Sequence, residues 1–514
     1  MTNLIVCCDG TWNTPDDEAD GVPTPTNVVK IAGCVASVDA SGKEQKKYYH
    51  PGVGTDGGVI DSLAGGGLGV GLGDNVKSAY KWLSVNYQPN DKIFLFGFSR
   101  GAFTVRSLAG MIGACGLLDL SSPQLTEAKL WRRVDKVFAN YRRKKPDPSK
   151  LKGMDFHNAG SDRIGAGKTP IHFLGVWDTV GALGIPDEVA FLNLLDNPKK
   201  HGFHDTKLSN LVMHARHAVA MDEQRRSFTP TLWTNQTAHN DIKQIWFPGV
   251  HSDVGGGYPQ TGLSDGALLW MLKEAEASGL VFREGAVAQI DPNPLDVLHD
   301  SLSGAFKALT TRPRSVPCIS GVKAPKNFHV SALERQANPP LAQPDYWPSK
   351  TLSVREMTTV DVFAREKWNS TGLYLEKGKT YEFSALGEWV DRSIKCGPSG
   401  TKDGKFSPGE VFHVAGAALG SIETIFKKVT GNDEANFWLT RRYEDVDWFA
   451  LVGVIANGKG IGKNSRLIEH EVFVIGNGVT YTPKSGGYLY AFANDAWQMY
   501  FNNKGSVRLS VKRA

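Results

Sequence analysis

Long apolar runs, dense cysteines and strongly charged tracts are absent from this sequence of 514 residues. No stretch reaches the roughly 18 apolar residues that a membrane-spanning helix needs. The amino-terminal MTNLIVCCDGTWN lacks a basic leader, and its apolar run is too short for a signal peptide. We therefore expect the chain to be made and folded in the cytoplasm. Any export must use a route without a cleavable signal.

Cysteine is scarce, and the six residues show no CxxC pair or regular spacing (Cys7, Cys8, Cys34, Cys115, Cys318, Cys396). In a chain of this length, that distribution indicates reduced and mostly buried thiols rather than a disulfide framework. The net charge of +5 is small, and no lysine- or arginine-rich tract or RNA-binding signature accompanies it. We expect no nucleic-acid partner.

Several functional motifs are also missing. The glycine-dense segment Gly52–Gly73 lacks the G-K-[ST] ending of a phosphate-binding loop. Nothing resembles a zinc-ligand cluster, a glycosidase carboxylate pair or a dinucleotide fold. Because the glycine-dense segment also carries apolar residues, two interpretations stay open: a flap over an acyl pocket, or an ordinary connection.

The first 260 residues alternate between apolar runs and amphipathic stretches. The expected strands are Asn3–Cys8, Lys92–Phe98, Ile171–Trp177, about His217–Met221, and Ile242–Val250. Between these strands, Asp74–Tyr87 and Ala102–Gly113 have the apolar spacing of helices. Strands that are apolar on both faces and alternate with helices predict a doubly wound, mostly parallel α/β sheet.

The pattern changes after about residue 350. Short aromatic and β-branched runs such as TYEFSALGEW and GYLYAFAND predict an antiparallel β-sandwich of roughly jelly-roll kind. The proline-rich segment Asn338–Ser349 is the natural linker. The sequence therefore predicts two domains, at residues 1–345 and 355–514.

A nucleophile motif lies between a predicted strand and a predicted helix. The segment GFSRG places Ser99 in the pattern G-x-S-x-G. At such a turn the serine hydroxyl is exposed, and the flanking glycines allow a close backbone approach. The motif and its context predict an α/β-hydrolase with Ser99 as the nucleophile.

A serine nucleophile needs a base and a carboxylate that orients the base. His251 closes the predicted strand Ile242–Val250 and opens a glycine-rich loop, so it is the expected base. Two carboxylates follow strands between Ser99 and His251, namely Asp178 and Asp222. We favour Asp178, which follows the strand next after that of the nucleophile, and keep Asp222 as its rival.

The oxyanion that forms during acyl transfer needs backbone N–H donors. One expected donor is the N–H of Arg100, directly after the nucleophile. The other is expected from the loop after the first strand, at Gly10 or Thr11. We expect no cofactor in catalysis.

Six segments, in order, carry a family resemblance: LIVCCDGTWN, PGVGT, FLFGFSRGA, GVWDTVG, HAVAMDEQR and WFPGVHSDVGGGY. Over about residues 1–345 the chain resembles the bacterial type VI secretion lipase effectors, whose catalytic domain is an α/β-hydrolase. The resemblance implies that Ser99 is the nucleophile and His251 the base. It also implies that Asp178, in the WDTV motif, is the acid.

The same resemblance implies an antibacterial phospholipase that attacks the membranes of target cells from their periplasm. Its implied partners are the phospholipid surface, a spike protein of the contractile secretion apparatus and an immunity protein. The absence of a signal peptide agrees with that route.

The carboxyl-terminal part, roughly residues 355–514, resembles the LecA-type galactose-binding lectin sandwich. In such lectins a calcium ion bridges the protein and sugar hydroxyls. The resemblance implies Ca²⁺ ligands at Asp495, Met499 (through its carbonyl), Asn502 and Asn503. The other sugar-contacting loop differs, because this chain reads SIKCG at residues 393–397. A glycan partner is expected, and the changed loop removes the basis for assigning galactose as that glycan.

Two alternatives remain beside a phospholipase. A soluble-ester esterase or thioesterase would use the same residues on a different substrate. A calcium-dependent glycan-binding protein would use the hydrolase domain as a scaffold only.

Overall fold

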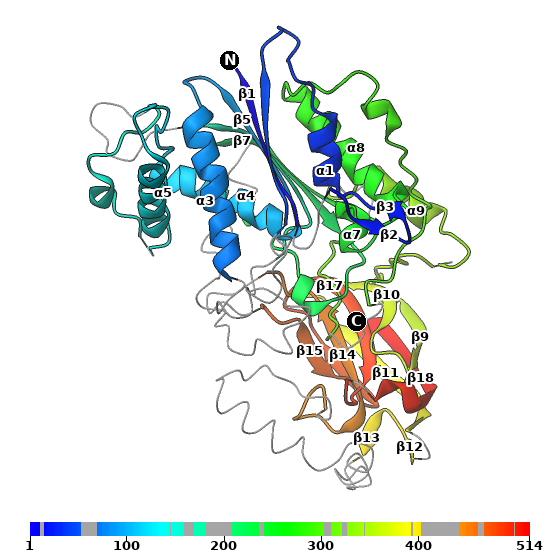
Figure 1. The fold of residues 1–514 in the computed structure, drawn as a ribbon. Coiled ribbons are helices and arrows are strands. Elements are labelled where there is room, and N and C mark those ends of the chain that lie inside the picture. The colour runs from blue at the N-terminus through cyan, green and yellow to red at the C-terminus, as the bar shows by residue number, and fades with distance from the viewer. Residues whose placement is uncertain are drawn as a thin grey trace.

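In the computed structural model of the chain, the described residues are 1–10, 15–52, 69–143, 145–158, 169–180, 208–235, 241–302, 310–320, 326–343, 345–391, 394–401, 441–460, 467–497 and 499–514. They form an α/β domain followed by an antiparallel β domain (Figure 1). Most of the glycine-dense segment Gly52–Gly73, including the proposed flap, lies outside the described residues.

The α/β domain is built on a six-stranded sheet in which every described neighbouring pair is parallel. The strands, in spatial order, are β4 (Gln45–His50), β1 (Asn3–Cys8), β5 (Lys92–Phe98), β6 (Ile171–Trp177), β7 (Val212–Ala220) and β8 (Ile242–Phe247). β1 and β5 are apolar and almost wholly buried, as both faces of a helix-covered sheet require. The predicted doubly wound α/β fold is confirmed.

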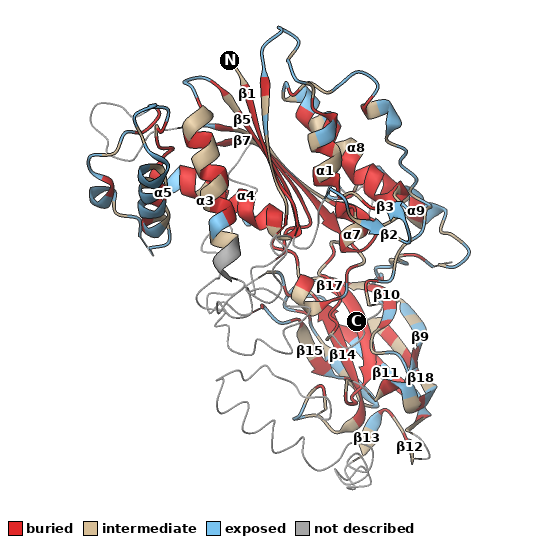
Figure 2. Ribbon diagram, in the orientation of Figure 1, coloured by how far each residue is buried: buried red, intermediate tan, exposed pale blue. Residues whose placement is uncertain are grey.

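Helices cover both faces of this sheet (Figure 1). One face packs against α3 (Gly69–Asn86), α4 (Ser99–Cys115) and α5 (Glu127–Tyr141). The other packs against α1 (Asn27–Cys34) and α8 (Gly262–Ala277). Figure 2 shows the strands between these layers as buried, whereas the outer side of α5 is exposed.

Smaller elements complete the α/β domain. They are β2 (Glu18–Ala19), β3 (Val22–Pro23), α7 (His251–Gly255), α9 (Val330–Ala337) and short 3-10 turns at Pro148–Leu151, Arg226–Phe228 and Val287–Gln289.

The order in which successive strands are added to the sheet changes direction at β1. The chain passes from β1 to β4 on one side and then returns to β5 on the other. In open parallel sheets, sites form outside the carboxyl ends of the strands at such a reversal. Ser99 directly follows β5 and therefore stands at this point. The carboxyl ends of the strands face the β domain (Figure 1).

The β domain contains two antiparallel sheets. One has the path β10 (Asn369–Leu375), β17 (Gly487–Ala493), β14 (Trp448–Ala456) and β13 (Ser399–Thr401), with β15 (Glu471–Val474) beside β14. The other has β12 (Ile394–Cys396), β11 (Tyr381–Asp391), β18 (Asn503–Arg513) and β9 (Met357–Phe363), with β16 (Gly478–Tyr481) beside β11. A shared core that includes Trp389, Phe449 and Leu509 joins the sheets. The predicted antiparallel carboxyl-terminal sandwich is confirmed.

The segment 310–320 lies between the two domains and bonds to both. On the sandwich side, Trp368 donates to Thr311 Oγ1 at 3.0 Å, and the hydroxyl of Tyr488 accepts from the Ile319 N–H at 3.0 Å. All six cysteines are in the described part of the chain, where each is a free thiol. Only Cys318, on this same segment, is half-buried rather than buried.

Candidate active site

The turn between β5 and α4 holds Ser99 in a left-handed backbone conformation, with φ of 56°. A Cβ on Gly97 would lie 2.5 Å from the Gly101 carbonyl oxygen. A Cβ on Gly101 would lie 2.0 Å from the carbonyl oxygen of Cys8, at the end of β1. The two glycines therefore permit a turn that other residues would prevent, and this turn presents the serine at the strand end.

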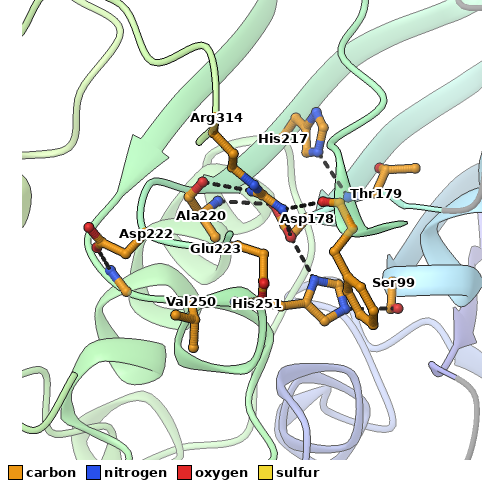
Figure 3. A network of polar contacts seen from close by, with 12 residues as sticks. Ser99, Asp178, Thr179, His217, Ala220, Asp222, Glu223, Val250, His251 and Arg314 are labelled. Carbon is orange, nitrogen blue, oxygen red and sulfur yellow. Dashed lines mark hydrogen bonds and ion pairs between the residues drawn. The ribbon is translucent and has the colours of Figure 1, made fainter. Parts of the chain in front are cut away.

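Ser99, His251 and Asp178 form one chain of hydrogen bonds (Figure 3). His251 Nε2 lies 2.9 Å from Ser99 Oγ, and His251 Nδ1 lies 2.6 Å from Asp178 Oδ2. Asp178 follows β6, the strand beside β5, so the two side chains start from neighbouring strand ends. The structure thus brings together three residues that lie as far as 152 positions apart in the sequence.

His251 is positioned by a helix rather than by the end of a strand. The expected strand Ile242–Val250 ends at Phe247, because Pro248 has no N–H to continue the ladder. Gly249 then adopts φ of 106°, and His251 is the first residue of α7. The prediction that His251 closes the strand was wrong, because the strand ends four residues earlier, at Phe247, and His251 begins a helix.

A bidentate arginine holds both carboxylate oxygens of Asp178, including Oδ2, which also bonds to His251. Arg314 Nη1 donates to Asp178 Oδ1 at 2.6 Å, and Nη2 donates to Oδ2 at 2.9 Å. The backbone N–H of Ala220 adds a 3.0 Å bond to Oδ1. Burial opposes ionisation of Asp178, but the Arg314 charge and the hydrogen bond from His251 hold the pKa of this carboxyl well below its usual range.

The ionised carboxylate fixes the tautomer of the imidazole. A carboxylate can only accept, so the proton is on His251 Nδ1 and Nε2 accepts from the Ser99 hydroxyl. The rings of Phe98 and Phe228 flank the imidazole, with centroids at 4.6 and 4.9 Å. Burial lowers the pKa of His251, although Asp178 acts in the opposite direction. A neutral imidazole oriented in this way can remove a proton from Ser99.

Glu223 supports the same histidine through the backbone. Its Oε2 lies 3.3 Å from the His251 N–H, while its Oε1 accepts from Ser301 Oγ at 3.0 Å. Arg225 forms an ion pair with this glutamate at 2.8 Å. Neither Glu223 nor Arg314 is among the site residues predicted from the sequence. The irregular segment TRPRSV around Arg314 offers no local signal for its contact.

The rival carboxylate, Asp222, is engaged elsewhere. Its Oδ2 accepts from the Gly249 N–H at 2.6 Å and from the Tyr346 hydroxyl at 2.8 Å, and its Oδ1 accepts from Trp347 Nε1 at 2.5 Å. In Figure 3 it is turned away from the imidazole. The structure therefore places Asp178, and not Asp222, beside His251.

The expected oxyanion donors are described only in part. Arg100 lies in the first turn of α4, where backbone N–H groups point out of the helix end. The N–H of Gly10 donates to Asp9 Oδ1 at 2.7 Å, so that carboxylate already engages it. The expectation that Gly10 or Thr11 offers its N–H to an ester oxygen stays a prediction. Thr11 lies outside the described residues.

The four expected calcium ligands lie at one end of the sandwich. Asn503 Nδ2 donates to Asp495 Oδ2 at 2.8 Å, and the Asn502 N–H donates to the Met499 carbonyl at 3.3 Å. The side-chain oxygens of Asn502 and Asn503 are buried, and no donor among the described residues bonds to them. Burial raises the pKa of Asp495 to about 7. Carboxylate, carbonyl and unpaired amide oxygens are a donor set that suits Ca²⁺.

Two features are absent from the described residues. They contain no group of three or more His, Cys, Asp or Glu side chains arranged to hold a metal ion. They also contain no helix that is long and apolar enough to cross a membrane.

Comparisons with known proteins identify relatives of the α/β domain. A yeast protein, the uncharacterized protein YEL023C of Saccharomyces cerevisiae, is 31% identical over 245 residues, which are 45% of this chain and 33% of the yeast protein. The chain thus spans about a third of the length of this relative.

Three solved structures are similar at low identity. A crystal structure of an uncharacterized protein from Pseudomonas aeruginosa matches with 20% identity over 57% of this chain and 49% of the other, at a TM-score of 0.32. A Tle1 effector bound to the VgrG spike of a type VI secretion system matches with 20% identity over 50% and 51%, at a TM-score of 0.29. The EclA N-terminal domain, a PllA-like lectin, matches with 15% identity over 30% and 95%, at a TM-score of 0.19.

One family model covers more than half of the chain. It describes the catalytic domain of Tle1-like phospholipase effectors of the type VI secretion system, and it matches residues 2–274. These residues include Ser99, Asp178 and His251. The chain belongs to the Tle1-like family of type VI secretion effectors.

Proposed function

We propose that the protein is a serine hydrolase that cleaves carboxylic esters of phospholipids. The observation that carries this proposal is the hydrogen-bonded chain from Ser99 through His251 to Asp178, with Ser99 on a strained turn at the sheet's reversal point. The description of the family as phospholipase effectors supports a lipid substrate.

In the proposed reaction, Ser99 Oγ attacks the ester carbonyl carbon while His251 Nε2 takes the hydroxyl proton. Asp178 stabilises the imidazolium that forms. The tetrahedral intermediate collapses when His251 returns the proton to the leaving alcohol oxygen, which leaves an acyl-enzyme. Water then attacks the acyl-enzyme by the same steps in reverse, with His251 as the base. The Arg100 N–H is the proposed oxyanion donor.

The test is mass spectrometry of mixed bacterial phospholipids after incubation with wild type and Ser99→Ala. We expect fatty acid and lysophospholipid from wild type only, and the released acyl chain identifies the ester position. Ser107→Ala is a matched control, because Ser107 lies in the same helix and both serines are 7% exposed. Lipid hydrolysis that persists in Ser99→Ala contradicts the proposal. Cleavage of a short-chain ester alone favours a soluble esterase or thioesterase.

We further propose an antibacterial role, with export by the type VI route to the periplasm of a target cell. Membership of the family supports this route. The expected partners are a spike protein of the secretion apparatus and an immunity protein. Expression of the chain in the periplasm of a susceptible bacterium, with and without Ser99→Ala, tests this role. Toxicity that is independent of Ser99 contradicts it.

A second proposed function belongs to the sandwich domain, namely calcium-dependent glycan binding. Two buried amide oxygens, to which no donor in the described part of the chain bonds, lie near the Asp495 carboxylate and favour it. Asp495, Met499, Asn502 and Asn503 would hold the ion, whose role would be to bind sugar hydroxyls. Binding to a glycan array that needs Ca²⁺ and is lost in Asp495→Asn supports this proposal. Binding without Ca²⁺ contradicts it.

A further inference from the structure

Arg314 is a buried arginine whose donors converge on the proposed catalytic acid. It is 5% exposed, and its two terminal nitrogens make four hydrogen bonds. Two reach Asp178, and the other two reach the carbonyl oxygens of Ala220 and Phe228, both at 2.6 Å. The carbonyl oxygens of Ala220 and Phe228 therefore hold the guanidinium in the orientation in which it bonds to the carboxylate (Figure 3).

We propose that Arg314 is a positioning residue, which sets the plane of the Asp178 carboxylate so that Oδ2 faces His251 Nδ1. This proposal rests on the proposed hydrolase function. The planar fork of an arginine fixes a carboxylate in two directions, which a single donor cannot do. Asp178 needs this restraint because it is fully buried and has a left-handed backbone, with φ of 35°.

The sandwich domain anchors the segment that carries Arg314. His470 Nε2 lies 2.8 Å from the carbonyl oxygen of Pro313, the residue directly before it. Arg312 donates to the Ile468 carbonyl at 2.6 Å, in addition to the bonds at Thr311 and Ile319 described above. Arg314 lies 40 positions beyond the end of the family match at residue 274. The second domain thus helps to complete the site of the first.

Loss of the Arg314 charge should also change the titration of the imidazole. The charged groups around His251 are Asp178, Glu223 and Arg225, and Arg314 neutralises much of the Asp178 charge. Without Arg314, the unpaired carboxylate would stabilise the imidazolium more strongly. The pKa of His251 should therefore rise, and the acidic limb of the activity profile should move to higher pH.

The first experiment compares Arg314→Gln with wild type in the full chain, on a short-chain ester. We expect kcat to fall on the order of 100-fold with a nearly unchanged KM, as for a displaced catalytic group. The acidic limb should move upward by roughly half a pH unit or more. The matched control is Arg335→Gln, because Arg335 is another buried arginine, at 2% exposure, that bonds to Pro294, Asp296 and Gln343 instead. Its profile should match wild type.

A second variant separates the effect of the Arg314 charge from that of its two-nitrogen hydrogen bonding. It also keeps the proposal testable if Arg314→Gln does not fold. Arg314→Lys keeps the charge but loses the fork, so kcat should fall about tenfold while the acidic limb stays near that of wild type. His470→Ala, in the sandwich, should lower kcat in the same direction by a smaller factor. Wild-type kcat in both Arg314 variants would overturn the proposal.

NMR titration of the His251 ring gives a readout that does not depend on turnover. An upward shift in the His251 pKa in Arg314→Gln supports the positioning role even if no ester is hydrolysed. Failure of the proposed function would instead appear as wild type without Ser99-dependent hydrolysis. A folded Arg314→Gln whose His251 titrates as in wild type would contradict the inference.

Discussion

Asp178 and Asp222 show how two carboxylates at neighbouring strand ends take different tasks. Asp178 meets an imidazole and a guanidinium, whereas Asp222 accepts bonds from Gly249, Tyr346 and Trp347. The second set contains no base: Tyr346 and Trp347 lie in the proline-rich linker, and Gly249 lies between β8 and α7. The chemistry of each acid therefore follows from its partners and not from its place after a strand.

This difference gives a prediction for the two acids. Asp178→Asn should lower kcat by about 10⁴-fold, because an amide no longer fixes the tautomer of His251. Asp222→Asn should leave kcat within a few fold but lower the free energy of unfolding by about 1–3 kcal/mol, since buried donors lose an acceptor. Ester hydrolysis and urea unfolding measure both effects. A larger loss of kcat in Asp222→Asn than in Asp178→Asn would reverse the assignment.

Ser99 and His251 could be predicted because each lies in a local pattern, GFSRG or GVHSD, with a strand before it. The choice between the two acids remained open, because each follows a strand and is polar. Arg314 could not be predicted, since its contact with Asp178 spans 136 positions and its own segment is irregular. A local motif predicts which side chain a turn exposes, but it does not predict which side chain from a distant segment will contact it.

The turn after β5 is the element on which the site depends most. Gly101 packs against the end of β1, so a side chain there would push the nucleophile's helix away from the sheet. The contact is with backbone, which cannot rotate aside as the end of a flexible side chain can.

We therefore expect Gly101→Ala to lower the free energy of unfolding by roughly 3 kcal/mol or more, and to remove activity. Gly33→Ala is the control, because Gly33 lies in α1 and a Cβ there would meet nothing within 4 Å. That change should stabilise the helix by about 0.5–1 kcal/mol. Chemical denaturation of both variants tests the pair. Equal stability for Gly101→Ala and wild type would show that the close approach is absent in solution.

Strand boundaries were predictable where the apolar run is uninterrupted. β1, β5 and β6 begin and end at the predicted residues. β7 begins at Val212, five residues before the predicted start, because His214 and Arg216 interrupt the apolar pattern. Their side chains bond to Asp241 and, for Arg216, to Glu274, so polar residues are accommodated at the start of this strand. α4 begins at Ser99 rather than at Ala102, since the turn leads directly into the helix.

At the scale of the whole molecule, the two domains differ in which groups offset the negative charge of a buried carboxylate. Asp178 bonds directly to the Arg314 cation. Among the described residues, the Asp495 carboxylate instead accepts from the Ala496 N–H and the Asn503 amide, and the charge of Arg442 lowers its pKa less than burial raises it. The pKa of Asp495 is accordingly raised by burial to about 7. Ionisation of Asp495 thus costs stability unless a cation is present.

This imbalance predicts how the stability of the sandwich depends on pH. The folded pKa exceeds the unfolded value, so the stabilising effect is complete below about pH 4 and is lost as the pH rises through about 7. Between these values the loss approaches about 1.4 kcal/mol per pH unit. Calorimetry in EDTA should show the sandwich transition falling in temperature from pH 5 to pH 8. Added Ca²⁺ should reduce that fall, and Asp495→Asn should lack it.

A transition that is equally pH-dependent in Asp495→Asn would assign the effect to other groups. Asp9 is one of them, because burial raises its pKa to about 6. It lies in the α/β domain, so the two transitions should separate the contributions.

The half-buried thiol of Cys318 lies on the segment between the domains, four positions from Arg314. Its Sγ is 3.0 Å from the Ser320 carbonyl oxygen and 3.7 Å from the Ser349 hydroxyl. The other five cysteines are buried. A maleimide dye on the native chain should thus react first at Cys318, without any engineered cysteine. The rate of labelling and the fluorescence of the attached dye would then report changes in the contact between the two domains.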